Sequence, residues 1–191
     1  MTAIPVEAIV IGASAGAVQA LSTLLPALPA SYPIPVLIVV HVPADRSNAL
    51  VPLLQKKCRL TVKEAEDKEP VQAGVAYFAP SDYHLLVETG RTLALSADGL
   101  VVHARPSIDV LFESAAEAYG PALVGVILTG ANEDGAAGLS SICRAGGLAL
   151  VQDPEEAYAG TMPSAALSAC ASARRLPLSD ITPYLLGLGT A

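Results

Sequence analysis

Short runs of aliphatic residues alternate with longer Ala- and Leu-rich stretches along this chain, and this rhythm constrains its fold more than any other feature. The runs cover residues 8–11, 36–40, 123–128 and 148–151. A strand that is apolar throughout is buried on both faces, as in a parallel sheet covered by helices. Alternation of such strands with helical stretches is typical of βαβ units. The pattern therefore predicts an α/β fold with a mostly parallel, doubly wound sheet flanked by helices.

The segments between and after these runs predict the helices and one irregular region. Helices are expected over residues 17–28, 47–57, 108–119, 135–144, 164–173 and 181–188, with Ser107 as the cap of the third. The middle of the chain instead holds short strand-like pieces at residues 60–65, 75–79, 84–88 and 92–96, separated by Pro and Gly. We interpret these pieces as β-hairpins attached to one edge of the sheet.

Length and charge limit the organisation and the partners. The 191 residues contain no repeat or linker, so one domain over residues 1–191 is expected. The net charge of −7 argues against nucleic acid and against an anionic membrane surface. The longest apolar runs are far shorter than the roughly 20 residues that span a bilayer, and no signal peptide is recognisable, so a cytoplasmic location without membrane insertion is expected.

The three cysteines, Cys58, Cys143 and Cys170, are scattered and contain no C-x-x-C pair. This spacing excludes a zinc knuckle and a disulfide framework, and it fits a reducing compartment. The sequence therefore predicts no disulfide and no metal site.

Three polar positions directly follow aliphatic runs, and they form the candidate site. They are Ser14, His41 and Asp134. In a parallel sheet the carboxyl ends of the strands meet at one edge, where open α/β folds bind their ligands. We therefore expect these three side chains to converge although they are far apart in the sequence.

Ser14 lies in Gly12-Ala13-Ser14-Ala15-Gly16, a G-x-S-x-G sequence at a strand-to-helix turn. Such a turn exposes a serine hydroxyl and directs helix N–H groups at a developing oxyanion. The alternative is a glycine-containing turn that only permits close packing or cradles a phosphate. A dinucleotide fingerprint fits less well because two of its glycines are absent.

A serine nucleophile needs a base, and His41 has the best position for it. His84 falls in a predicted hairpin and His103 in a polar connection, so both rank lower. Asp134 is expected to orient a histidine through Nδ1–H, as in a serine–histidine–carboxylate triad. The alternatives are a histidine satisfied by backbone groups, and Asn132 or Asp134 acting as the cap of the helix at 135–144.

An ordered series of short motifs gives the chain a family resemblance. The motifs are Gly12-Ala13-Ser14, His41-x-Pro43, Lys63-Glu64-Ala65-Glu66-Asp67, Ala79-Pro80-x-Asp82-x-His84, Arg105-Pro106-Ser107-x-Asp109-Val110-Leu111-Phe112, Leu128-Thr129-Gly130, Asp134-Gly135-Ala136-x-Gly138 and Met162-Pro163. In this order they cover nearly the whole chain. The chain resembles the catalytic domain of the bacterial chemotaxis protein-glutamate methylesterases.

The resemblance implies a role for each candidate residue. Ser14 is the nucleophile, His41 the general base and Asp134 its orienting carboxylate, and the backbone N–H of Ala131 serves the oxyanion. The implied reaction is hydrolysis of glutamate γ-methyl esters on cytoplasmic helices of chemoreceptors, often with deamidation of glutamines, and it uses no cofactor and no metal.

The resemblance also indicates where this chain departs from the family. The usual N-terminal receiver domain is not expected, because the first strand begins within ten residues of Met1, so control would come from a separate regulatory protein or be absent. Ala15, Val40 and Glu133 replace the usual Thr, Gln and Asn. These changes are expected to affect efficiency and substrate choice more than reaction type.

Two arginines are candidates for substrate binding in this acidic chain. Arg105 precedes the expected helix at 108–119 and Arg46 follows His41, so both are placed to attract an acidic receptor segment. The alternative for each is an ordinary solvated arginine. At the level of the whole chain, the competing hypotheses are a serine hydrolase of the same fold acting on a different ester, and a non-enzymatic regulatory module.

Overall fold

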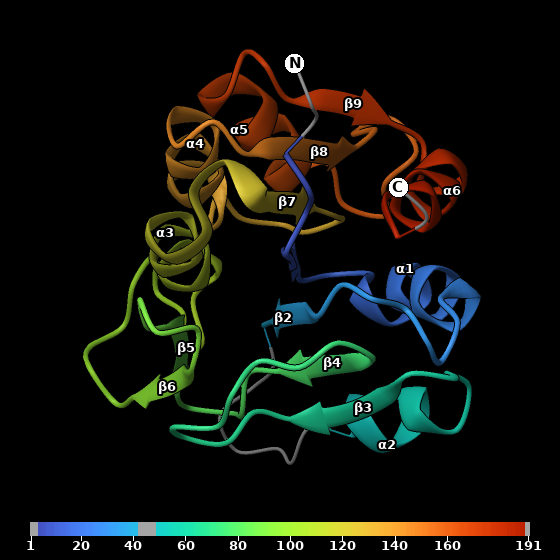
Figure 1. Ribbon diagram of the computed structural model, residues 1–191. Coiled ribbons are helices and arrows are strands. Elements are labelled where there is room, and N and C mark those ends of the chain that lie inside the picture. The colour runs from blue at the N-terminus through green and yellow to red at the C-terminus, as the bar shows by residue number, and fades with distance from the viewer. Residues whose placement is uncertain (1–3, 42–48, 190–191) are drawn as a thin grey trace.

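The computed structural model describes residues 4–41 and 49–189, which form a seven-stranded parallel sheet with helices on both faces (Figure 1). The strand order is β3-β4-β2-β1-β7-β8-β9. The strands are β1 (Ala8–Ala13), β2 (Val36–Val40), β3 (Thr61–Glu64), β4 (Val75–Phe78), β7 (Leu123–Ile127), β8 (Leu148–Gln152) and β9 (Arg174–Leu176). Every residue of β1, β2 and β7 is buried, as their aliphatic sequences predict. The fold class expected from the sequence is confirmed.

The helices divide into two layers, one on each side of the sheet (Figure 1). One layer holds α1 (Ala17–Leu24), α2 (Leu50–Gln55) and α6 (Leu178–Leu188), and the other holds α3 (Ile108–Tyr119), α4 (Ala136–Arg144) and α5 (Thr161–Ala169). Two short 3-10 turns, Leu25–Ala27 and Gly120–Ala122, follow α1 and α3. Each layer buries its own hydrophobic core against the sheet. None of the helices in the described part of the chain has the length and apolar character needed to cross a bilayer.

The central region differs from the expected series of hairpins. The pieces at 61–64 and 75–78 are β3 and β4, which pair in parallel inside the main sheet. Only β5 (His84–Val87) and β6 (Leu93–Ser96) form an antiparallel hairpin, and it is a separate two-stranded sheet next to α3. In the sequence, a short apolar strand looks the same whether it pairs in a parallel sheet or in a β-hairpin. The ten-residue connection at 65–74 is long enough to return the chain to the starting end of β3, and this makes the parallel pairing possible.

Near the C-terminus, the sequence predicted the bounds of one helix incorrectly and missed one strand. The helix expected at 164–173 is α5, which begins earlier at Thr161 because Pro163 is tolerated in the first turn, where its missing N–H has no partner within the helix. The edge strand β9 was missed because its residues Arg174 and Arg175 are exposed and lack the aliphatic pattern of the inner strands.

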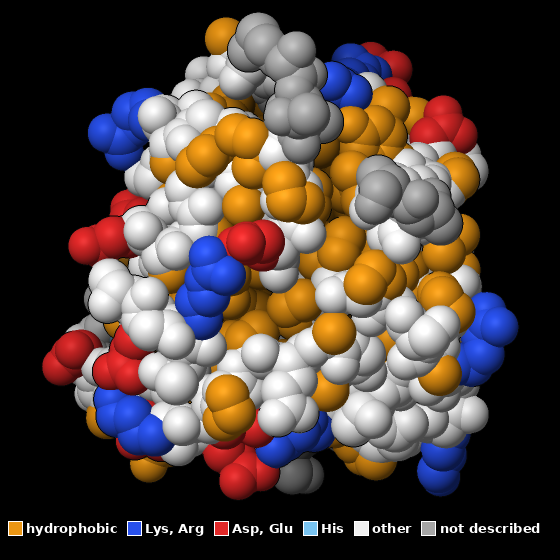
Figure 2. All heavy atoms as spheres, in the orientation of Figure 1, with side chains coloured by type: hydrophobic (Ala, Val, Ile, Leu, Met, Phe, Trp, Pro, Cys, Tyr) orange, Lys and Arg blue, Asp and Glu red, His pale blue; other side chains and the backbone are white. Residues whose placement is uncertain are grey.

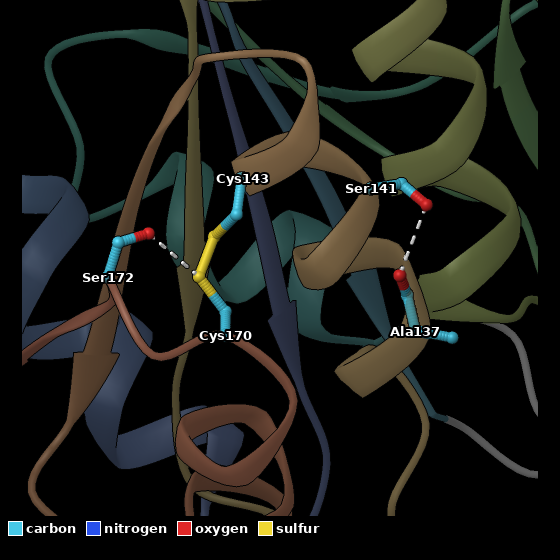
Figure 3. Close-up of a disulfide and its surroundings, with 5 residues drawn as sticks. All are labelled: Ala137, Ser141, Cys143, Cys170 and Ser172. Atoms are coloured by element: carbon cyan, nitrogen blue, oxygen red, sulfur yellow. Dashed lines mark hydrogen bonds between the residues drawn. A yellow bond between two sulfur atoms is a disulfide. The ribbon is translucent and has the colours of Figure 1, made fainter.

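A disulfide joins Cys143, in the last turn of α4, to Cys170, which directly follows α5 (Figure 3). The expectation of no disulfide was therefore wrong, and the cysteines give no argument for a reducing compartment. The two residues are 27 apart in sequence, but packing of α4 on α5 brings their Cα atoms within 6.5 Å. That separation lies within the range a disulfide bridges. Cys58 is a free thiol.

Gly138 allows α3 and α4 to approach closely. A Cβ at this position would lie 2.5 Å from the Cβ of Phe112 and 3.0 Å from the Cα of Asp109. We expect Gly138→Ala to lower the free energy of unfolding by about 1–3 kcal/mol in urea denaturation, because overpacking outweighs the gain in helix propensity.

The matched control for this prediction is Gly187→Ala in α6, where a Cβ would meet nothing within 4 Å. This change is expected to be neutral or slightly stabilising. Equal effects of the two substitutions would contradict the role of Gly138 in packing.

Candidate active site

The sheet register brings Ser14 and His41 together at the carboxyl ends of neighbouring strands. The last residues of β1 and β2, Ala13 and Val40, are paired, and each is followed directly by one of the two candidates. The backbone N–H of His41 donates to the carbonyl of Ala13 at 3.3 Å. On the other side, the N–H of Ser14 donates to the carbonyl of Thr129 at 2.9 Å. Ser14 therefore lies between the end of β2 and the loop that follows β7.

The turn that carries Ser14 requires glycine at its end. Gly16 precedes α1 with φ of 87°, and a Cβ there would lie 2.7 Å from the Cβ of Tyr158. The hydroxyl of Thr129 donates to the carbonyl of Ala15 at 2.7 Å and accepts the N–H of Ala159 at 2.9 Å. This one side chain therefore ties the turn to the loop after β8. Ser14 itself is half-buried.

His41 and Asp134 are hydrogen-bonded as the sequence predicts, but through the other ring nitrogen. Nε2 of His41 lies 2.7 Å from Oδ2 of Asp134, whereas the expectation was Nδ1. The His41 side chain is 14% exposed and that of Asp134 is fully buried. Because the carboxylate is held deep against the start of α3, the far nitrogen of the ring reaches it. Nδ1 is therefore the nitrogen left to accept a proton.

Asp134 also caps a helix, although not the one expected. Its carboxylate accepts the N–H groups of Ile108 at 2.7 Å and Asp109 at 3.1 Å, which are the first two of α3. The hydroxyl of Ser107 donates to the same carboxylate at 2.8 Å, so Ser107 does not cap α3 with its own side chain as predicted. The helix that follows Asp134, α4, has no side-chain cap.

These contacts keep Asp134 ionised. Burial raises the pKa of its carboxyl, but the hydrogen bonds from His41, Ile108, Asp109 and Ser107 stabilise the carboxylate more, and the net pKa is lowered. An ionised Asp134 accepts a hydrogen bond from Nε2–H and thereby selects the neutral tautomer of His41 whose lone pair is on Nδ1.

Asp109 makes the reciprocal contact between the two helices. It lies in the first turn of α3, and its Oδ1 accepts the N–H of Gly138 in α4 at 2.7 Å. Burial, with repulsion from Asp134, raises the pKa of Asp109 to about 6. The native state therefore binds this proton more tightly than the unfolded chain, where the pKa is near 3.8.

The raised pKa of Asp109 makes the effect of Asp109→Asn on the free energy of unfolding depend on pH. At pH 8 the wild type holds a buried carboxylate, so the variant is expected to have a free energy of unfolding about 1–2 kcal/mol higher. The difference should shrink as pH falls through about 6 and be small near 4, where Asp109 is neutral in the native state and close to its midpoint of 3.8 in the unfolded chain. Urea denaturation across pH 4–8 measures this, with Glu117→Gln on the exposed side of α3 as the control. A difference in the free energy of unfolding that does not change with pH would contradict the raised pKa of Asp109.

The loop after β7 carries the expected oxyanion donor, Ala131, together with residues to which the sequence analysis gave no role at the site. Thr129 N donates to Oε1 of the buried Gln152 at 3.0 Å, and Gly130 N donates to the carbonyl of Ala159. Asn132 Oδ1 accepts the N–H of Asp134, the i, i+2 contact that Asn side chains often make and that the sequence spacing could have suggested. Ala131 is exposed, and its N–H has no hydrogen-bond acceptor among the described residues.

Three of the other candidate residues, His84, His103 and Arg105, lie outside this cluster. His84 is buried between the N–H of Ser107 and the carbonyl of Gly99, and His103 is exposed. Arg105 donates twice to Asp82 Oδ1 and also to the carbonyls of Ala97 and Asp98. These contacts favour a structural role for Arg105 over substrate binding. Arg46 lies outside the described residues.

Comparison with known proteins agrees with this geometry. A profile of the family described as CheB methylesterase matches residues 9–185. The chain belongs to the CheB methylesterase family. The catalytic domain of Thermotoga maritima CheB methylesterase superposes with a TM-score of 0.90 at 33% identity, covering 97% of this chain and 100% of that one.

Sequence relatives fall into two size classes. A Chromohalobacter salexigens protein named protein-glutamate methylesterase/protein-glutamine glutaminase is 42% identical over 183 residues, which cover 94% of this chain but only 51% of that protein. A Leptospira interrogans relative, provisionally given the same name, is 47% identical over 182 residues, 95% of this chain and 94% of its own length. The family resemblance found in the sequence is confirmed.

Proposed function

We propose that this CheB-family chain is a single catalytic domain over residues 1–191 that hydrolyses glutamate γ-methyl esters on chemoreceptors. Ser14 is the nucleophile, His41 the general base and Asp134 the carboxylate that orients it. The observation that carries this proposal is the 2.7 Å hydrogen bond between His41 Nε2 and the buried Asp134. The pairing of Ala13 with Val40 places Ser14 beside this histidine.

The reaction follows from these positions in two steps. Ser14 Oγ attacks the ester carbonyl while His41 Nδ1 takes the hydroxyl proton, and the proton then passes to the departing methoxide to give methanol. Water, deprotonated by the same nitrogen, hydrolyses the acyl-enzyme to free glutamate and Ser14. The N–H of Ala131, which has no acceptor among the described residues, is the donor proposed for the oxyanion in both steps. A glutamine side chain would react in the same way and release ammonia.

The surface beside the turn that carries Ser14 offers room and an exposed aromatic ring for contact with a protein substrate. A pocket of about 370 Å³ beside the nucleophile turn is lined by Gly16, Thr129 and Tyr158 among others, and the Tyr158 side chain is 80% exposed. On the face in Figure 2, acidic and basic side chains lie in small mixed groups with hydrophobic ones between them. Because the chain carries a net charge of −7, docking of a Glu-rich helix is expected to depend on apolar contact and on the neutral methyl ester more than on long-range attraction.

The proposal is tested by measuring methanol release from a methylated chemoreceptor fragment, with the unmethylated fragment as the blank. Labelling with a fluorophosphonate separates the alternatives, because only an activated serine reacts. Methanol release with labelling at Ser14 is the expected result. Labelling without methanol release would favour a hydrolase of a different ester, and no labelling at all would favour a regulatory module.

A further inference from the structure

Asn132 lies against the base of the proposed triad. Its Nδ2 is 3.3 Å from Nδ1 of His41, the nitrogen that Asp134 leaves free. Its Oδ1 accepts the backbone N–H of Asp134 at 3.2 Å. Since the amide oxygen is engaged with the main chain, the NH₂ group is the end that faces the imidazole.

This contact is compatible with only one protonation state of the ring. In neutral His41 with the proton on Nε2, Nδ1 carries a lone pair and accepts an N–H of Asn132. In the imidazolium, Nδ1 also carries a proton, and two donors then face each other. Asn132 therefore favours the neutral ring, which is the form that acts as a base.

The loop presents Asn132 at a fixed position. Gly130 donates to the carbonyl of Ala159 and accepts the N–H of Met162, which anchors the loop to the start of α5. The charged group in contact with His41 among the described residues is Asp134. Glu133 is exposed and lines a separate pocket with Asp109 and residues of α4 and α5. Asp134 and Asn132 thus act on opposite nitrogens of one ring.

We propose that Asn132 is a positioning residue that holds His41 neutral, with the Nδ1 lone pair oriented for the proton of Ser14. Asp134 accepts from Nε2–H in both charge states, and its negative charge by itself favours the imidazolium. The contact with Asn132 opposes this and favours the neutral ring. Ser14 Oγ replaces or shares the Asn132 contact when substrate binds. The catalytic part of this inference rests on the proposed function, whereas the effect on the ring does not.

The protonation of His41 can be measured directly by titrating its ring nitrogens with ¹⁵N NMR. Removing the amide in Asn132→Ala is expected to raise the protonation midpoint by about half a pH unit. In Asn132→Asp a carboxylate faces the ring instead and favours the imidazolium, so a larger rise is expected.

Asn132→Ser separates the ring contact from the loop contact. A serine hydroxyl can still accept the N–H of Asp134, as serine commonly does two residues before its partner, but it is too short to reach Nδ1. The midpoint should therefore rise as it does in Asn132→Ala. Unchanged midpoints in Asn132→Ser and Asn132→Asp would overturn the proposal, and so would a rise confined to Asn132→Ala, since loop loosening would then be the cause.

The rate of fluorophosphonate labelling at Ser14 provides the catalytic readout. A midpoint raised by about half a pH unit lowers the neutral fraction of the ring at most about threefold, so Asn132→Ser is expected to label about two- to threefold more slowly than wild type near pH 6 and at nearly the wild-type rate near pH 8.5. An equal loss at both pH values would indicate a structural role and contradict the proposal. Raised midpoints in a protein that releases no methanol would leave this inference standing and refute only the proposed function.

Discussion

Ser14→Ala is expected to lower turnover of a methyl-esterified receptor by a factor on the order of 10⁴–10⁶, and His41→Ala by about the same factor. The two residues act on one proton, so each is of little use without the other. The double variant Ser14→Ala/His41→Ala should therefore be hardly slower than either single variant. Initial rates of methanol release from the three variants give this comparison.

The matched control is Ser141→Ala, which removes a serine hydroxyl that donates to a carbonyl of its own helix (Figure 3). This variant should keep its activity, and neither Ser14→Ala nor Ser141→Ala should change the free energy of unfolding by more than about 0.5 kcal/mol. Losses from Ser14 and His41 that add up in the double variant would refute a shared proton transfer.

Asp134→Asn is expected to damage both activity and stability, which sets Asp134 apart from Ser14. Turnover should fall by a factor on the order of 10⁴, because the tautomer and orientation of His41 are lost. The amide presents one oxygen where the carboxylate presents two, so its NH₂ group faces donors among Ser107, Ile108 and Asp109. The free energy of unfolding should drop by about 2–4 kcal/mol as buried donors lose their acceptor.

The pH dependence of stability identifies the source of that loss. The pKa of Asp134 is lowered by its hydrogen bonds, so its contribution is complete above the ordinary value of 3.8 and disappears as pH falls through the lower native value. Wild type and Asp134→Asn should therefore differ fully at pH 5–8 and converge in strong acid. Urea denaturation at fixed pH values measures the gap. A variant that is inactive but as stable as wild type at pH 7 would show that Asp134 serves catalysis alone.

The sequence correctly predicted the inner strands, which are covered by apolar side chains on both faces. An aliphatic run such as 36–40 has one plausible setting, a strand covered on both faces, and β2 occupies those same residues. It also predicted that Ser14, His41 and Asp134 would gather at one edge, because strand direction alone places them there. The structure brings His41 and Asp134 into contact and sets Ser14 beside His41.

Other features depend on contacts between distant segments, which no local pattern encodes. The ring nitrogen used by His41 depends on how deeply α3 holds Asp134. The capping of α3 by Asp134 requires the loop after β7 to pass the start of a helix 26 residues earlier. The Cys143–Cys170 disulfide likewise follows from the packing of α4 against α5.

The central position of β1 has a consequence for how the protein is made. β1 pairs with β2 on one side, but on the other side Ala8 lies opposite Leu123, so its second neighbour is synthesised more than a hundred residues later. Closing so long a loop is slow, and nascent chains fold as complete units. A ribosome that stalls before β7 has emerged would hold a chain with Ser14 and His41 already made and no carboxylate to orient the histidine. Esterase activity should therefore appear abruptly during synthesis, once the whole domain with Asp134 has left the exit tunnel, rather than grow with chain length.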